Sequence, residues 1–454
     1  LQKLMRAKGI SNIDHRLRQT DFTHQEEAPQ FPWLGLALDE LEKQDVIVLI
    51  GSDVRHEQPL ANHRIRRAVM NGAKVVVINP LKTELNYSVS YEVVASPQGL
   101  VKSLAGLVAK SGEVPVELTS LKQTTNSDTD AIVALLDNAD NAIILLGNLA
   151  VQMPVYDTLR ALSATLAKNT SSQLGYLAES ANTAGAWLAG VVPHRVAGGD
   201  VAAKEGLSTT DMLMVGLNTM VLYDIDPAYD CDNPQLAMAA MHHAKVIAFS
   251  SYASKELLEV ADILLPISCA AEMSGSFINA EGRVQSFRAA SATLGESKPG
   301  WRVLRVLGNR LDIDGFDYLS SSDVLAEFNK TVVIKKDNSY PIKGDYVAFD
   351  DVTQLQRISQ VHAYSVDAQI RRANALQKTY TQERNRVSLN SKDIKQLSFE
   401  TLDSITVKQG DSRTIMSLVA DDTVPIGCVK MLSGTNKSAL LGAAFGAVEL
   451  QGEH

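Results

Sequence analysis

The first 80 residues alternate between apolar runs and amphipathic spacing. Residues 45–50 carry an almost unbroken apolar run, which is typical of a strand buried on both faces. Residues 60–69 place apolar side chains at helical spacing, with Pro59 suited to the first turn and Gly72 to the end. A second apolar run follows at residues 74–79. This order predicts a right-handed crossover between two parallel strands.

The same alternation continues through the next two hundred residues. Four further apolar runs read as strands, at residues 142–146, 220–223, 246–250 and 262–266. Segments with apolar residues at helical spacing lie between these runs. This alternation predicts parallel sheets covered by helices. Residues 171–206 are rich in Gly, Ala and Ser and carry few strand signals, so we expect them to connect two α/β regions.

After about residue 330 the pattern becomes short and β-like. Residues 404–408 alternate between apolar and polar side chains, residues 409–411 suit a hairpin turn, and residues 413–419 resume the alternation. We therefore predict three successive domains. They are a first α/β domain at 1–175, a second α/β domain at 176–340 whose N-terminal half is expected to be missing, and a β-rich domain at 341–454.

Charge and composition narrow the classes of function. The chain has 43 Lys and Arg against 52 Asp and Glu, a net charge of −9, and only 6% aromatic residues, which disfavours nucleic-acid binding. No apolar run reaches the roughly 18–20 residues of a membrane span. Cys231, Cys269 and Cys428 form no CxxC pair. They favour a reducing compartment and side chains that fill space rather than a cluster or zinc site.

Two short patterns could carry chemistry. The loop Gly51-Ser52-Asp53 follows a buried strand, where α/β sheets bind ligands, but no glycine-rich phosphate motif accompanies it, so a tight turn is the simpler interpretation. The basic residues between 55 and 67 suit a phosphate or acidic partner, although a solvated helix face is favoured. The adjacent His242 and His243 lack ligand-like spacing. No catalytic residue and no metal ligand can be named.

The most distinctive segment is residues 261–287, which read ADILLPISCAAEMSGSFINAEGRVQSF. A strand ending at Pro266 leads into a dense series of polar and glycine residues that includes Glu272, Asn279 and Gln285. Such a loop suits a bulky polar ligand or a facing domain. The alternative is a structural loop whose polar groups satisfy one another.

Together with residues 295–309, this segment resembles the G subunit of bacterial NADH-quinone oxidoreductase, which is the large iron–sulfur subunit of the peripheral arm of complex I. Other segments agree, so that the resemblance covers essentially the whole chain. These segments are residues 12–19, 33–35, 45–80, 178–190 and 363–373.

The resemblance implies an α/β fold like that of formate dehydrogenases and other molybdopterin oxidoreductases. Two α/β domains with parallel sheets flank a pterin in those enzymes, and a C-terminal double-psi β-barrel closes over it. In the iron–sulfur subunit of complex I, the [2Fe–2S] and [4Fe–4S] clusters lie on N-terminal Cys-rich motifs. None of those motifs is present here, so the chain resembles a shortened, cluster-free part of that protein without a cofactor.

The resemblance also implies partners and a location. The partners are the other peripheral-arm subunits and the subunit's own N-terminal cluster-bearing region, with no nucleic acid and no direct membrane insertion. The location is the cytoplasmic side of the bacterial inner membrane, within a membrane-bound complex. This fragment alone is expected to be inactive, and to support electron transfer from NADH to quinone as a scaffold.

The metal-ligand position of the related enzymes falls near Thr20 or Asp21, neither of which supplies a soft sulfur ligand. We therefore expect a vestigial pterin pocket, filled by Arg55, Arg283, Phe287 or water, with Glu281 or Asp53 as partners of the cations. The residues expected to line it are Gly51, Ser52, Asp53, Asn279, Glu281 and Arg283.

Two alternatives remain open at this point. One is an active molybdopterin oxidoreductase that acts on formate or a similar small substrate. The other is a nucleotide-binding module that uses the turns at Gly51 and Gly147.

Overall fold

The computed structural model describes residues 1–346, 354–380 and 383–452. The chain divides into two compact units, and each is built from three separate segments. The barrel unit comprises residues 19–180, 336–363 and 380–454, and the three-strand unit comprises residues 1–18, 181–335 and 364–379. The two compact units interleave along the chain. The division into three successive domains stays a prediction.

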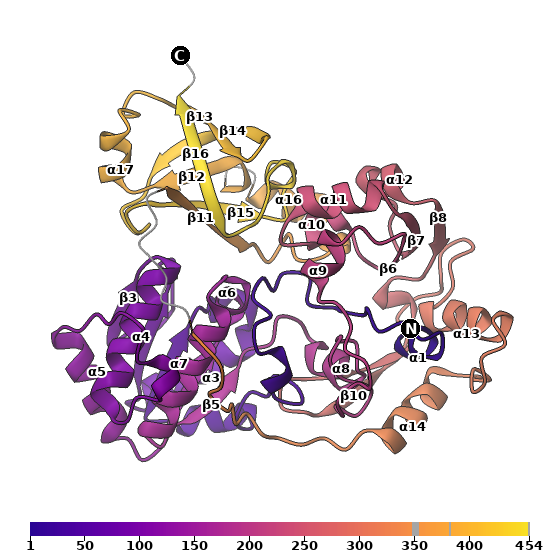
Figure 1. Cartoon of the computed structure of the whole chain (residues 1–454), viewed down its shortest axis with the longest axis horizontal. Helices are drawn as coiled ribbons and strands as arrows, with labels where there is room; N and C mark the ends of the chain where they lie inside the picture. Colours follow the sequence, from indigo (N-terminus) through magenta and orange to yellow (C-terminus); the bar gives the residue numbers. More distant parts are fainter. Residues whose placement is uncertain (347–353, 381–382, 453–454) are drawn as a thin grey trace. The chain divides into compact units, whose positions relative to one another are not determined.

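A five-stranded parallel sheet forms the first half of the barrel unit (Figure 1). Its spatial order is β3-β2-β1-β4-β5, so the chain builds outward from β1 and then returns to the other side of it. The predicted strand–helix–strand unit is confirmed, with α3 spanning Pro59–Met70. The strands are β1 Val46–Ile50, β2 Lys74–Asn79, β3 Tyr91–Val94, β4 Ala142–Leu146 and β5 Gln173–Tyr176.

Helices cover this sheet because their apolar faces match its apolar strands. Leu100 and Leu104 of α4 and Leu159 and Leu162 of α7 are buried in one core with alternate residues of β1 and β4. Each such side chain contributes roughly 1.5–3 kcal/mol through its burial. The longer helices are α4 Pro97–Ser111, α5 Ser127–Asp137 and α7 Tyr156–Asn169.

Residues 171–206 connect the two units, whose boundary falls between residues 180 and 181, but they also contain a strand that their sequence pattern did not predict. Gln173–Tyr176 is β5, the fifth strand of the sheet. Gly175 weakened the strand signal, and the structure shows why glycine stands there. A Cβ on Gly175 would collide with the backbone oxygen of Leu34, and the neighbouring Tyr176 N–H donates to the Trp33 carbonyl at 2.9 Å. The glycine lets residues 33–35 cover the edge of the sheet.

The second half of the barrel unit is a closed six-stranded barrel. The predicted hairpin is confirmed, because β13 and β14 pair antiparallel around the turn at Gly410, whose φ is +59°. The order around the barrel is β11-β15-β12-β14-β13-β16. The strands are β11 Leu355–Val361, β12 Arg386–Leu389, β13 Ser404–Gln409, β14 Ser412–Ala420, β15 Cys428–Ser433 and β16 Gly446–Gly452.

Three parallel strands in the order β6-β7-β8 give the second unit its sheet, as the apolar runs predicted. The distinctive segment 261–287 begins as β8 and continues as an antiparallel hairpin of β9 and β10. The strands are β6 Thr219–Tyr223, β7 Lys245–Ser250, β8 Ile263–Pro266, β9 Gly275–Ile278 and β10 Val284–Phe287. The longer helices are α11 Pro234–His242, α13 Gly300–Arg310 and α14 Ser321–Thr331.

Short helices complete both units. Those of the barrel unit are α2 Val54–Glu57, α6 Asn148–Gln152 and α17 Ser391–Gln396. Those of the three-strand unit are α1 Gln2–Ala7, α8 Thr183–Leu188, α9 Thr209–Met214, α10 Pro227–Asp230, α12 Lys255–Val260, α15 Ala368–Arg371 and α16 Asn374–Thr379. None of the helices among the described residues has the length and apolar character needed to cross a bilayer.

Candidate functional site

The carboxyl ends of β1 and β4 mark the point where the strand order of the five-stranded sheet reverses. Ligands of open α/β sheets bind at such a point. The turns after the two strands touch one another, since the Ala150 N–H donates to the Gly51 carbonyl at 3.0 Å. Gly51 has a φ of +57°, and a Cβ there would collide with Ala150. A Cβ on Gly147 would lie 2.5 Å from that of Ser52. Both glycines are therefore required by close packing.

Ser52 joins this turn to the end of β2. Its N–H donates to Asn79 Oδ1 and its carbonyl accepts from Asn79 Nδ2, each at 2.8 Å. The Ser52 hydroxyl is enclosed and has no hydrogen-bond partner among the described residues. The backbone of the predicted loop is thus fixed, while one polar group at the strand-order reversal is left unsatisfied.

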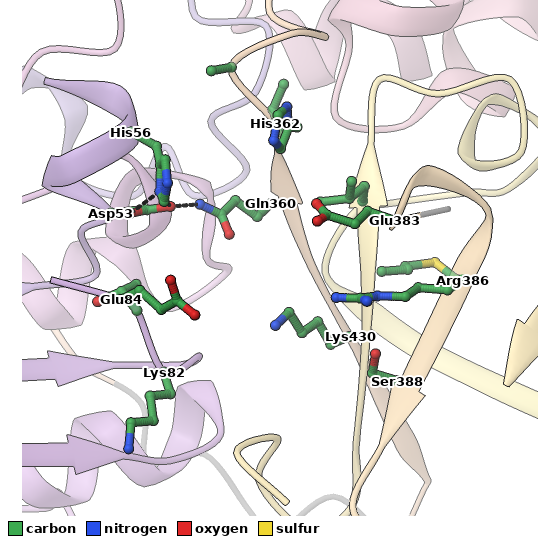
Figure 2. Close-up of a pocket in the computed structure, with 15 residues that line it drawn as sticks. Asp53, His56, Lys82, Glu84, Gln360, His362, Glu383, Arg386, Ser388 and Lys430 are labelled. Carbon is green, nitrogen blue, oxygen red and sulfur yellow. Dashed lines mark hydrogen bonds and ion pairs between the residues drawn. The ribbon is translucent and has the colours of Figure 1, made fainter. Parts of the chain in front are cut away.

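Asp53 links the sheet to the barrel within the same unit. Its side chain is only 7% exposed, and its carboxylate accepts hydrogen bonds from His56 Nδ1 at 2.9 Å and from Gln360 Nε2. Gln360 belongs to β11 and lies 307 residues away along the chain. Figure 2 shows both donors converging on this carboxylate. A buried carboxylate needs such donors, because an unpaired charge is costly away from water.

A polar cavity of about 310 Å³ lies beside Asp53. Its walls come from the loops after β1 and β2 on one side and from β11, β12 and β15 of the barrel on the other. In Figure 2, Arg386 and Lys430 extend from the barrel toward the side that carries Glu84. The charged and polar residues around it are Asp53, His56, Lys82, Glu84, Gln360, His362, Glu383, Arg386, Ser388 and Lys430. A volume of this size is enough for a small polar ligand.

The charges around the cavity are only partly paired inside the protein. Lys82 Nζ lies 3.5 Å from a Glu92 carboxylate oxygen, and Lys430 Nζ lies 3.6 Å from one of Asp421. No ion pair involves Arg386 within the described ranges. Burial lowers the pKa of His362, and the neighbouring Glu383 carboxylate acts in the opposite direction. The lining carries three cations, Lys82, Arg386 and Lys430, and three carboxylates, those of Asp53, Glu84 and Glu383, so it would suit a polar ligand with both charged and hydrogen-bonding groups.

Glu57 is a buried carboxyl near Asp53 that the sequence pattern did not single out. Burial raises the pKa of its carboxyl well above the usual range, and the nearby carboxylates of Asp53 and Glu179 add to this shift. This environment favours the protonated carboxyl of Glu57, and one of its oxygens is enclosed without a hydrogen-bond partner in the described part of the chain. The available signal was its position four residues after Asp53, which places both on one face of a helical turn.

Asn279, Glu281 and Arg283 lie in the other unit, at the turn between β9 and β10. The Asn279 side-chain oxygen accepts from the backbone N–H groups of Glu281 at 3.1 Å and Arg283 at 2.9 Å. Asn279 Nδ2 donates to a Glu281 carboxylate oxygen at 2.9 Å. These contacts are those of a polar turn that satisfies itself.

The side chains expected to fill a vestigial pocket have local roles in the structure. Phe287 packs edge-on against Phe277 with ring centroids 4.9 Å apart. Arg55 NH1 donates to the Glu84 carbonyl at 3.2 Å. Asp53 takes His56 and Gln360 as its partners. A filled pterin pocket with a cation paired to Asp53 or Glu281 stays a prediction.

The residues at the expected metal-ligand position are engaged elsewhere. Thr20 Oγ1 donates to the Gln152 carbonyl at 3.0 Å. The Asp21 carboxylate accepts from the Thr23 and Asp157 N–H groups at 3.0 and 2.8 Å, and burial raises its pKa. The donors near this position therefore do not fit a molybdenum or tungsten ion, which prefers thiolate.

The cysteines do not change this conclusion. Burial raises the pKa of Cys231 and of Cys428 to about 12, so both thiols stay protonated and are poor ligands. Across residues 1–346, 354–380 and 383–452, no group of three His, Cys, Asp or Glu side chains is arranged to hold a metal ion.

Comparison with known proteins agrees with the architecture of the sheet and barrel. The sequence profile of the molybdopterin oxidoreductase family matches residues 1–310. The chain belongs to this family. The alpha subunit of the F420-dependent formate dehydrogenase of Methanocaldococcus jannaschii is 24% identical over 386 residues, which cover 73% of this chain and 57% of that protein.

The G subunit of the NADH-quinone oxidoreductase of Mycobacterium bovis is 25% identical over 336 residues, covering 67% of this chain and 38% of the relative. This confirms the resemblance to the iron–sulfur subunit of complex I. The match thus spans between about a third and three fifths of the length of these relatives. Acetylene hydratase from Pelobacter acetylenicus has the same fold, with a TM-score of 0.59 over 99% of this chain and 83% of that chain, at 11% identity.

Proposed function

We propose that this member of the molybdopterin oxidoreductase family is the scaffold region of the iron–sulfur subunit of an NADH-quinone oxidoreductase. It would support electron transfer from NADH to quinone without itself holding a redox centre. The observation that carries the proposal is the engagement of Thr20 and Asp21 in internal hydrogen bonds, near the position that the family resemblance assigns to the metal ligand.

The relatives support the choice of complex. The mycobacterial G subunits match two thirds of the chain, and they belong to NADH-quinone oxidoreductases. In this proposal the partners are the other peripheral-arm subunits and the cluster-bearing part of the same subunit. The complex would lie at the cytoplasmic face of the bacterial inner membrane. The [2Fe–2S] and [4Fe–4S] clusters would be held outside residues 1–454, and this fragment alone would be inactive.

A scaffold must keep its parts in fixed register, because electron transfer depends steeply on distance. Asp53 contributes by joining the turn after β1 to Gln360 of the barrel. Asp157 contributes at a second place, where its carboxylate accepts from His24 Nδ1, Arg160 and the Tyr340 hydroxyl at 2.6–2.8 Å. Asp157 and Arg160 are both buried, so this network holds residues 24, 157–160 and 340 together.

The test is purification of the tagged full-length protein from its own organism, after mild solubilisation of the membranes. We expect NADH–quinone reductase activity to co-purify with it, together with iron but without stoichiometric molybdenum or tungsten. The variants Thr20→Val and Asp21→Asn should keep this activity within about twofold, since neither residue binds a metal in the proposal. Stoichiometric molybdenum or tungsten in the wild-type protein would overturn it.

An active molybdopterin oxidoreductase acting on formate or a similar small substrate is the second candidate. It is favoured by the polar cavity beside Asp53, in which Arg386 and Lys430 could meet an anionic ligand. Thr20 and Asp21 supply no thiolate, so in this candidate function the metal ligand would have to be a carboxylate oxygen of Asp21. In that case Asp21→Asn would lose both the metal and formate-dependent dye reduction, whereas Thr20→Val would keep them.

A further inference from the structure

Helix α13 of the three-strand unit (Figure 1) borders an open groove of about 620 Å³ on the protein surface. One face of the helix is used internally. Leu304 is buried with Phe249 and Ile267, and Gly308 lies so close to the Phe316 ring that a Cβ would collide with it. Leu265, Val303 and Leu307 both pack against this core and line the groove, whereas Arg302, Val306 and Arg310 line it from outside the core.

The floor of the groove is apolar and unusually exposed. Val306 is 51% exposed and Leu319 is 81% exposed, and the half-buried ring of Trp301 also lines the groove. Large apolar side chains at such exposure are tolerated singly, but a contiguous set around a concavity marks a surface for another molecule.

The rim of the groove is basic. Lys298, Arg302, Arg305 and Arg310 line it, and no acidic residue does. Among the described residues none of the four forms an ion pair, and the Arg305 Nε is enclosed without a hydrogen-bond partner. This concentration of unpaired positive charge contrasts with the net charge of −9 for the chain. An anionic partner would remove the repulsion between these cations.

The spacing along α13 specifies what such a partner must look like. Arg302, Val306 and Arg310 succeed one another at intervals of four residues, so they form one stripe along the helix. A cation, an apolar side chain and a second cation thus lie about 6 Å apart in succession. An amphipathic helix with carboxylates on either side of its apolar face would match both the charges and the apolar floor.

We propose that the α13 groove, defined by Trp301, Arg302, Val306, Arg310 and Leu319, docks an acidic amphipathic helix of another polypeptide. Apolar side chains of the partner fill the space above Trp301, Val306 and Leu319, while its carboxylates pair with Arg302 and Arg310. The assignment rests on this surface alone. It therefore stands or falls separately from the scaffold proposal, which concerns the metal-ligand position in the other unit.

The experiment uses the full chain and a fluorescein-labelled peptide of about 15 residues with leucine at helical spacing and glutamate elsewhere. We expect fluorescence anisotropy to show saturable binding that weakens as salt is raised. A scrambled peptide of the same composition should bind about tenfold more weakly, because it cannot present one apolar face. Equal binding of the two peptides would overturn the proposal.

Protein variants separate the groove from general electrostatic attraction. Arg302→Glu/Arg310→Glu should weaken peptide binding about tenfold or more, and Val306→Asp should have a comparable effect. The matched control is Arg66→Glu/Lys204→Glu, which reverses two exposed cations outside the groove and should leave the affinity unchanged. Circular dichroism melting checks that each variant is folded. An equal loss in the control pair, or tighter Arg302-dependent binding of duplex DNA or of phosphatidylserine vesicles, would refute an acidic protein partner.

Discussion

Each of the two sheets is built from parallel strands, but the strands compared here differ in how far their residues are buried. Every residue of β1 and of β4 in the five-stranded sheet is buried. In the three-stranded sheet, burial alternates along β6, and no residue of β8 is fully buried. β1 and β4 are central strands of their sheet, whereas β6 and β8 are edge strands, and β8 leaves the apolar side chain of Ile263 half exposed.

The difference indicates where each unit can meet other molecules. A sheet buried on both faces offers ligands only the carboxyl ends of its strands, and the cavity beside Asp53 lies there. The thinner sheet instead leaves apolar surface at its edge and on neighbouring helices, among them α13. The same family fold therefore combines a closed region with a small polar cavity and an open region suited to protein contacts.

The largest expected effect comes from equal truncations in the two sheets. Leu49→Ala removes a fully buried side chain from the central strand β1 and should lower the free energy of unfolding by about 3 kcal/mol. Ile263→Ala removes a side chain on β8 that is 51% exposed, and it should lower the free energy of unfolding by less than about 1 kcal/mol. Urea unfolding of the two variants measures this, and similar losses would remove the contrast between the sheets.

A second pair compares two glycines that share a positive φ. Gly51→Ala should lower the free energy of unfolding by about 2–3 kcal/mol. Alanine is strained in the left-handed conformation, and its methyl group would collide with Ala150. Gly216→Ala, in the three-strand unit, has a φ of +69° but nothing within 4 Å of the added atom. Gly216→Ala should lower the free energy of unfolding by only about 1 kcal/mol. Thermal melting distinguishes the two, and an equal change in Tm would contradict the close contact at the strand-order reversal.

The pH dependence of the three-strand unit gives a smaller effect. Burial raises the pKa of Asp226 from 3.8 to about 6, with Arg371 acting in the opposite direction. The folded state thus binds the proton more tightly than the unfolded state. This contribution to stability is fully present below pH 3.8 and is lost as the pH rises to about 6. The loss should be about 3 kcal/mol in the free energy of unfolding.

Asp226→Asn isolates this contribution, because the amide cannot titrate. We expect the difference in unfolding free energy between wild type and Asp226→Asn to change across this pH range and to stay constant above it. Asp211→Asn in the same unit serves as a control. A difference that is independent of pH for Asp226→Asn would show that its carboxyl titrates at an ordinary pKa.

Much of the secondary structure could be predicted because it depends on local pattern. The runs at residues 45–50, 74–79 and 142–146 are apolar throughout, and each forms a strand within one residue of its predicted bounds. The alternation at residues 404–408 and the turn before Ser412 likewise give a hairpin. β5 was missed because four residues containing a glycine carry little periodicity, and only its neighbour β4 and the segment at Trp33 make it a strand.

The candidate site was only partly predictable. Asp53 could be singled out from its position after an apolar run, since local order alone places it at the end of a strand. Gln360, His362, Arg386 and Lys430 carried no such signal, because each lies on a barrel strand or next to one and reaches the cavity through the fold.

Local periodicity and residue chemistry, then, determined the α/β character of the chain, the β-rich C-terminal region and the lack of a thiolate at Thr20 and Asp21. The tertiary structure alone decided that the chain folds into two interleaved units and that Gln360 meets Asp53 across 307 residues. It also decided that Arg302, Val306 and Leu319 share one groove. The reason is physical, since helical and strand periods act over a few residues, whereas these contacts depend on how distant segments pack.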